Sequence, residues 1–237
     1  MLKKETIGMK PTNKIIGIVD GDVLIYRACN KAIKEELDVR KTFDKIYDEV
    51  KMNTACDKYS LHISGGGNFR KEIKQDFLKY KGKRREKPEN YLECRDYVTK
   101  NHNPIMVPNY EADDTASVEA YKYIKENQLY MLITLDKDWK TIGGLFYNLL
   151  YNNLFAVSTI EGIEFFHQQL LTGDAVDNIP GIEGVGPVKA NRILKDKNLK
   201  DQFKAIIKAY KTHYPKDFKA RLNVMGTMLY LIKDFKD

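Results

Sequence analysis

The sequence is poor in the residues that build zinc sites. It contains three cysteines (Cys29, Cys56 and Cys94) and four histidines among 237 residues. Neither type occurs in the close pairs that zinc ligands form. We therefore expect no zinc site and a reducing, cytoplasmic compartment.

Long apolar runs are also missing. No run approaches the roughly 20 residues that a membrane-spanning helix requires. The charged N-terminal residues 1–14 precede an apolar segment that is too short for a signal peptide. Repeats and low-complexity segments do not occur either. The length and the 43% hydrophobic content instead predict a globular α/β core, with or without a small appendage, that does not enter a membrane.

Charge is what the sequence has in excess. The formal net charge is +7, which by itself is common among cytosolic proteins. It becomes informative where basic residues lie close to acids that hold metal, because that combination predicts binding to a polyanion.

Acidic residues cluster ahead of one helical pattern. Glu111, Asp113 and Asp114 place three carboxylates in four residues, followed by an apolar-periodic segment that reaches Ile124. A single acid at this position is explained by the positive end of the helix dipole. Three acids so close repel one another and need a countercharge, for which a divalent cation is the obvious candidate.

Two apolar segments that we predict as buried strands end at further acids. Residues 14–20 end at Asp20, and residues 129–134 lead to Asp136 and Asp138. Functional groups of parallel sheets gather at the carboxyl ends of strands. Asp20 precedes a predicted tight turn at Gly21 and a helix. The alternative role for Asp20 is a plain helix N-cap, and Asp22 fits that role better. Together with the acidic helix start, these strand ends predict a metal site on one rim of the sheet.

Residues 79–87 hold six basic residues in nine, with Tyr80 and Gly82 between them. A run of charge is usually a solvated surface. An aromatic residue inside the run favours a segment that follows a phosphate backbone, with Tyr80 stacking on a base.

A glycine-rich hairpin follows the predicted helix 160–171. Gly181, Gly184 and Gly186 precede Pro187, which suits the first turn of a new helix. Backbone N–H groups at such a turn can seat a phosphate. A plain corner between two helices is the alternative, and Lys189 downstream favours the phosphate seat.

The motifs IVDGD, YKGKR, EADD, TLDKDW and GDAVDNIPGIEGVGPVKA occur in this order between about residues 15 and 194. Together they resemble the 5′-3′ exonuclease and flap endonuclease family, particularly its small bacteriophage members. The resemblance implies a mostly parallel sheet flanked by helices, as in PIN-like nucleases, in a monomer. It also implies an α/β core over residues 1–159 with a short arch at about 77–100. Residues 160–237 would form a helical region with a helix–three-turn–helix element that holds duplex DNA, often with a bound K⁺.

The resemblance also implies roles for individual residues. Asp20, Glu111, Asp113 and Asp114 would hold one metal ion, and Asp136, Asp138, Asp174 and Asp177 a second, as two Mg²⁺ or Mn²⁺ ions. Lys81 and Arg84 would act on the scissile phosphate. The candidate DNA contacts are Tyr80, Lys83, Arg70, Gly181, Gly184, Gly186 and Lys189.

One position departs from the family pattern. The family usually has an aspartate in the turn before its FR or WR dipeptide, and Gly65 most nearly occupies that position here. One carboxylate is therefore missing, and Asp22 is the candidate to compensate for it.

The expected function is metal-dependent hydrolysis of DNA, or of RNA–DNA hybrids, at 5′ ends and flaps, as in phage-type replication or repair. The alternatives are a catalytically weak, structure-specific DNA-binding protein and a PIN-type ribonuclease.

Overall fold

The computed structural model describes residues 14–81 and 86–236. A five-stranded sheet lies at its centre, in the order β2-β1-β3-β4-β5. The pairs β1–β2, β1–β3 and β3–β4 are parallel, and β4–β5 is antiparallel. This confirms the predicted mostly parallel sheet. Its strands are β1 (Ile15–Asp20), β2 (Lys58–His62), β3 (Leu129–Thr134), β4 (Gly144–Asn148) and β5 (Asn153–Val157).

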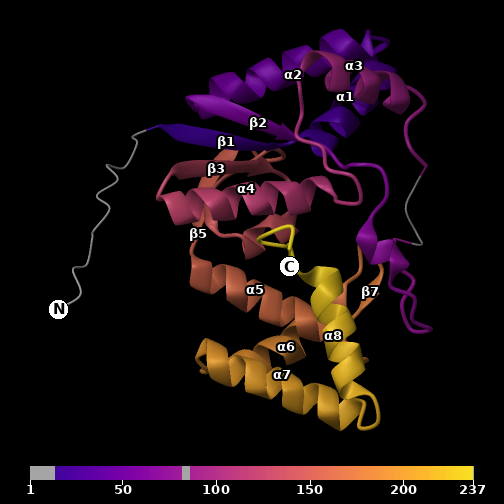
Figure 1. The fold of residues 1–237 in the computed structure, drawn as a ribbon, viewed down its shortest axis with the longest axis vertical. Helices are drawn as coiled ribbons and strands as arrows, with labels where there is room; N and C mark the ends of the chain where they lie inside the picture. The colour runs from indigo at the N-terminus through magenta and orange to yellow at the C-terminus, as the bar shows by residue number, and fades with distance from the viewer. Residues whose placement is uncertain (1–13, 82–85, 237) are drawn as a thin grey trace, which may run out of the picture.

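Helices cover both faces of the sheet (Figure 1). One face carries α1 (Gly21–Glu35), α2 (Val39–Thr54) and α3 (Tyr91–Asn101); the other carries α4 (Ala112–Glu126) and the 3₁₀ turn η2 (Lys137–Thr141). Neighbouring residues of β1 enter different cores, since Val19 packs with the first layer and Ile18 with the second. Burial on both faces explains why β1 and β3 are almost continuously apolar.

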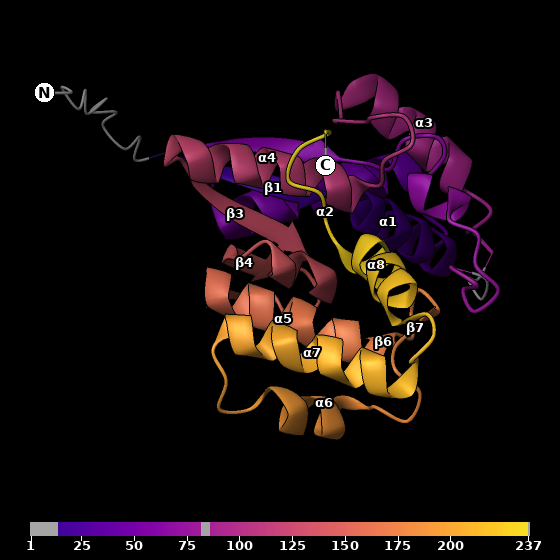
Figure 2. The same ribbon diagram turned by 60° about the horizontal axis from the view of Figure 1, so that its bottom comes forward.

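The C-terminal helices form a region with its own apolar core (Figure 2). Partly buried side chains from the segment before the arch, among them Phe77 and Leu78, pack against that core. The elements are α5 (Thr159–Thr172), the hairpin β6 (Gly173–Asp174) and β7 (Ile179–Pro180), α6 (Pro187–Leu194), α7 (Leu199–His213) and α8 (Phe218–Leu229).

Element starts follow the predicted chemistry at α6 and differ at α1. Pro187 is the first residue of α6 and Gly186 its N-cap, as expected. At α1 the N-cap is Asp20, whose Oδ1 accepts from the Val23 amide at 3.1 Å, and not Asp22. Gly21 belongs to the helix rather than to a turn. A Cβ on it would lie 2.6 Å from the His62 carbonyl, so its role is close packing against β2.

The predicted arch at about 77–100 falls partly on residues 82–85, which lie outside the described residues. Within the described part, a short 3₁₀ turn, η1 (Phe69–Glu72), leads towards it, and α3 occupies its second half. The segment before the arch is fixed to the helical region by a guanidinium between two rings. Arg221 lies 4.2 Å from the Phe77 ring and 4.4 Å from the Tyr214 ring.

The C-terminal tail returns from α8 to the sheet. It crosses α4 in the view of Figure 2, and Leu231 enters the core between α4 and the sheet. Among the described helices, none combines the length and the apolarity needed to span a membrane.

Candidate active site

The carboxyl end of β1 places Asp20 at the rim of the sheet. Its side chain is 3% exposed, and its Oδ2 accepts from Thr134 Oγ1 at 2.7 Å. Burial and the neighbouring carboxylate of Asp22 raise the pKa of Asp20 to about 7. The groups around Asp20 therefore stabilise its charged form too little to offset the loss of solvent.

The first turn of α4 brings Asp113 to the same rim. Trp139, which is fully buried, donates from Nε1 to Asp113 Oδ1 at 2.7 Å. Burial and then the charges of Asp136 and Asp20 raise the pKa of Asp113 well above its usual value. The electrostatic coupling shows that the end of β1, the loop after β3 and α4 meet at one place.

The turn after β3 supplies two more acids. Asp136 caps η2, with its Oδ1 accepting from the Asp138 amide at 2.8 Å. Burial raises the pKa of Asp138 to about 8, with Asp136 and Asp174 adding to the shift. Gln169 of α5 donates from Nε2 to Asp138 Oδ1 at 2.6 Å. The helical region therefore reaches directly into the acidic rim.

Asp114 differs from these acids because it has a basic partner. It is fully buried, and Arg70 donates to both of its oxygens at 2.7 Å. Arg70 also donates to the Tyr230 carbonyl at 2.6 Å. This bidentate pair ties η1, α4 and the C-terminal tail together.

Glu111 is held by the segment at the base of the arch. Tyr80 donates its hydroxyl to Glu111 Oε2 at 2.8 Å, and Lys81 Nζ contacts Oε1. Burial alone would raise the pKa of Glu111, but Lys81 and Tyr80 lower it below its usual value. Lys81 also lies 3.5 Å from Asp177, and its amide donates to the Asp177 carbonyl at 2.8 Å.

Asp174 also has a basic partner. It lies in β6, is 2% exposed, and accepts from the Val176 amide at 2.8 Å. Lys137, between the two acids of η2, reaches its Oδ2 at 3.0 Å. Burial opposes ionisation of Asp174, but Lys137 outweighs it and lowers the pKa.

The rim therefore carries two kinds of acid. Lys81, Arg70 and Lys137 form salt bridges with Glu111, Asp177, Asp114 and Asp174. Within the described ranges, salt bridges are absent from a second set, which consists of Asp20, Asp113, Asp136 and Asp138. We call these the paired acids and the unpaired acids.

The oxygen donors and the excess of negative charge fit a hard divalent cation better than zinc. Among residues 14–81 and 86–236, however, no three His, Cys, Asp or Glu side chains already form a group that could hold a metal ion. The contacts explain this arrangement. Thr134, Trp139 and Gln169 orient the unpaired acids, while basic side chains occupy the paired ones. Cation binding thus requires side chains to rearrange.

The missing acid at Gly65 has a steric explanation. A Cβ there would lie 1.9 Å from the Val107 carbonyl oxygen, so this backbone has no room for an aspartate. The candidate substitute, Asp22, accepts from the Ser64 amide at 3.1 Å, and Arg95 lies 3.7 Å from its Oδ1. Asp22 is close enough to raise the pKa of Asp20, yet its carboxylate is engaged with the turn.

The predicted DNA contacts fall into four groups. Arg70 is 3% exposed and its guanidinium is occupied, so it presents no group to a strand in this structure. Tyr80 is partly buried, with its hydroxyl on Glu111. Lys83 and Arg84 lie outside the described residues. The last group is on the surface of the glycine hairpin and consists of Gly184, Gly186 and Lys189, while Gly181 is packed against residues 171–173.

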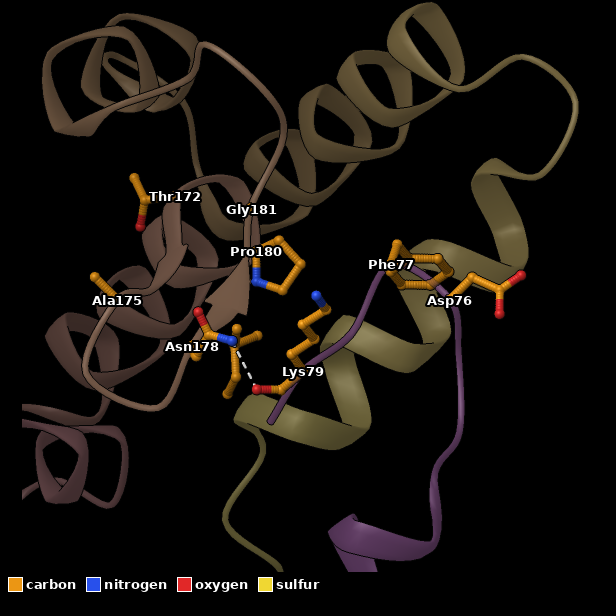
Figure 3. Close-up of a pocket in the computed structure, with 9 residues that line it drawn as sticks. Asp76, Phe77, Lys79, Thr172, Ala175, Asn178, Pro180 and Gly181 are labelled. Carbon is orange, nitrogen blue, oxygen red and sulfur yellow. Dashed lines mark hydrogen bonds between the residues drawn. The ribbon is translucent and has the colours of Figure 1, made fainter. Parts of the chain in front are cut away.

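A groove of about 400 Å³ lies beside the acids, between the segment before the arch and the β6–β7 hairpin. Figure 3 shows the Lys79 side chain rising between the rings of Pro180 and Phe77. Asn178, the neighbour of Asp177, donates from Nδ2 to the Lys79 carbonyl at 2.6 Å and forms part of the wall. The groove offers an ammonium group and two rings next to the acidic rim.

Several residues of the site were not found by sequence reasoning. Trp139 and Lys137 stand inside the TLDKDW motif, so their proximity to the acids was a usable signal. No sequence signal marked Gln169, since it is an ordinary polar residue on a helix. Nothing in the sequence of the C-terminal tail links it to the acids, yet the Tyr230 carbonyl accepts a hydrogen bond from Arg70.

Comparison with curated proteins gives relatives that include flap endonucleases and 5′-3′ exonucleases. No family model matches the chain. A protein named flap endonuclease Xni from Shewanella baltica is 27% identical over 203 residues, covering 77% of this chain and 74% of its own. A 5′-3′ exonuclease from Aquifex aeolicus is 26% identical over 146 residues, covering 55% of this chain and 48% of its own.

Solved structures with the same fold cover nearly the whole chain. The T5 D15 protein, co-crystallised with metal ions, superposes with a TM-score of 0.60 at 17% identity, covering 91% of this chain and 99% of its own. The catalytic core of Rad2 in complex with a DNA substrate gives 0.52 at 14% identity, covering 93% of this chain and 75% of its own. The ordered motifs, the acidic rim, the relatives and the shared fold agree: the chain is similar in sequence and in fold to flap endonucleases and 5′-3′ exonucleases.

Proposed function

We propose that the protein is a metal-dependent 5′-3′ exonuclease and flap endonuclease that hydrolyses phosphodiester bonds in DNA at branched or nicked duplexes. The observation that carries this proposal is that Asp20, Asp113, Asp136 and Asp138, from β1, α4 and the turn after β3, lie close enough together for their charges to raise one another's pKa values. Relatives named flap endonuclease and 5′-3′ exonuclease, and neighbouring structures that contain metal ions and DNA, support it.

Two Mg²⁺ or Mn²⁺ ions are the proposed cofactors. Asp20, Asp113 and Glu111 would hold the first, with Asp114 behind them. The second would lie among Asp136, Asp138, Asp174 and Asp177. Two such ions supply an activated water and charge stabilisation for the leaving oxygen. The chain's own contribution is to fix these carboxylates, and the contacts from Thr134, Trp139 and Arg70 support that role.

The base of the arch would act on the phosphate. Lys81 lies among the acids, so a phosphodiester entering the rim meets its ammonium group, which can stabilise charge in the transition state. We assign the same role to Arg84 by resemblance alone. Because Arg70 is buried on Asp114, we assign it to supporting the acids instead of contacting DNA.

The helical region would hold duplex DNA. We propose an α/β unit at 1–159 and a helical unit at 160–237, whose hairpin at 181–186 and Lys189 contact one strand, with K⁺ as a candidate ion there. The groove in Figure 3 would accommodate an unpaired nucleotide beside the cleaved bond, since bases stack on rings and phosphates attract lysine.

A cleavage assay tests this function. Labelled 5′-flap, nicked and blunt duplexes are incubated with Mg²⁺, with Mn²⁺ and with a chelator. We expect metal-dependent release of 5′-phosphorylated products from the flap substrate. Absence of cleavage with both metals would contradict the proposal.

A non-catalytic, structure-specific DNA-binding protein is the second candidate. Two observations favour it: Gly65 leaves no room for the usual aspartate, and no ready-made metal group occurs among the described residues. Tight binding of the flap substrate without cleavage in either metal would select this alternative.

A further inference from the structure

Gln169 is buried next to the acidic rim and has an oxygen atom without a partner. The side chain belongs to α5 and is 4% exposed. Its Nε2 donates to Asp138 Oδ1 at 2.6 Å. Its Oε1 is buried and makes no hydrogen bond within the part of the chain that the structure describes.

A buried carbonyl oxygen without a hydrogen-bond partner needs a hydrogen-bond donor or a cation next to it. Leaving a buried acceptor unsatisfied destabilises the folded protein, because the oxygen has lost its hydrogen bonds to water. Oε1 and Nε2 are bonded to the same amide carbon. Oε1 therefore lies close to the Asp138 carboxylate that Nε2 contacts. The nearby charges of Asp136 and Asp174 disfavour an anion there. The partner must therefore be a cation or a water that donates hydrogen bonds.

We propose that Gln169 is a positioning residue of the acidic rim, which fixes Asp138 through Nε2 and offers Oε1 to the hydrated divalent cation bound there. This inference rests on the proposed function. Amide oxygens are ordinary ligands of hard cations, and waters of the inner shell commonly donate to such oxygens. The residue acts by orienting a ligand and a water, without touching DNA.

Gln202 provides a matched control. It is also a glutamine with 4% exposure, on the neighbouring helix α7. Both of its ends are satisfied, because Oε1 accepts from His167 at 2.9 Å and Nε2 donates to Glu164 at 3.0 Å. Comparing Gln169→Leu with Gln202→Leu separates a role at the rim from the general cost of removing a buried glutamine.

The test is a titration of the full chain with Mn²⁺ in the absence of DNA, by calorimetry, together with thermal unfolding. We expect Gln169→Leu to bind Mn²⁺ about ten-fold more weakly or worse, with a smaller loss of Tm in the metal-free protein than Gln202→Leu shows. Gln202→Leu should lose Tm and keep its Mn²⁺ affinity. Gln169→Glu, which retains an oxygen, should gain more Tm on adding Mn²⁺ than the unaltered protein does.

Three outcomes would overturn the inference. They are an unchanged Mn²⁺ affinity in Gln169→Leu, an equal loss of affinity in both leucine variants, and a Mn²⁺-induced gain in Gln169→Glu no larger than in Gln169→Leu. Failure of the proposed function is distinguishable, because the unaltered protein would then neither bind Mn²⁺ nor cleave a flap.

Discussion

The paired and the unpaired acids lie on the same rim and differ in what balances their charge. Arg70, Lys81 and Lys137 neutralise the paired acids, so Asp174 and Glu111 have lowered pKa values. The unpaired acids have raised pKa values because they are buried and repel one another, as at Asp20 and Asp138. The first group is stabilised by the protein itself, whereas the second needs a ligand from outside. The comparison teaches that acids of one motif can have opposite roles.

Asp113→Asn should separate the two groups most strongly. Removing an unpaired acid deletes a metal ligand and also relieves repulsion from Asp136 and Asp20. We expect cleavage of a 5′-flap to fall by at least about 10³-fold, with duplex binding and Tm preserved. Steady-state cleavage and fluorescence anisotropy in a chelator measure the two effects. Unchanged cleavage would remove the acidic rim from the mechanism.

Lys81→Met tests the paired group at the base of the arch. We expect cleavage to fall by about 10²-fold, because an ammonium group is lost beside the phosphate. Mn²⁺ binding should not weaken, since Lys81 occupies Glu111 in the metal-free structure. Lys125→Met, on the exposed surface of α4, is the control. A Lys81→Met protein that cleaves at the normal rate would show that Lys81 has no part in the reaction and only forms salt bridges with Glu111 and Asp177.

Asp114→Asn tests the paired group at its buried end. The substitution leaves the buried guanidinium of Arg70 without its partner. We expect a loss of about 3–5 kcal/mol in the free energy of unfolding, measured with urea. The double variant Arg70→Met, Asp114→Asn should recover much of that loss. A cost below about 1 kcal/mol would place Asp114 with the unpaired acids.

The smallest expected effect is a pH dependence. Folding raises the pKa of Asp20 to about 7 and that of Asp138 to about 8 from 3.8. The folded protein keeps these protons at a pH where the unfolded chain has released them. Its stability should therefore fall as pH rises from the unfolded pKa of 3.8 to the folded values, and level off above them. Tm of the chelator-treated protein should drop by a few degrees from about pH 4 to about pH 8.

Asp20→Asn should flatten this pH dependence, because one of the two titrating groups is gone. Saturating Mg²⁺ should weaken it too, since a bound cation replaces the protons. A metal-free Tm that rises over the same range would contradict the assignment of unpaired acids.

Most of the fold was predictable because it depends on local patterns. Apolar runs predicted β1 and β3, and acids before a helical period predicted the start of α4. The Gly-Pro pair predicted where α6 begins. These features depend on the hydrophobic period and on backbone preferences, which neighbouring residues determine. The N-cap of α1 was misassigned, because Asp20 and Asp22 are both acids that can cap a helix.

The acids of the site were also named from sequence, but their partners were not. Arg70 is 44 residues from Asp114 in the chain, and Gln169 is 31 residues from Asp138. Nothing local distinguishes such residues from ordinary surface residues. The same holds for Gly65, whose lack of space comes from a carbonyl of the distant residue Val107.

The sequence alone determined that acids would stand at the ends of parallel strands and at a helix start, because strand period and helix capping are local. Only the tertiary structure decided which acids are neutralised and which are left for a cation. That division depends on basic side chains and burial brought from remote segments, and a carboxylate's pKa responds to its surroundings in space rather than to its neighbours in the chain.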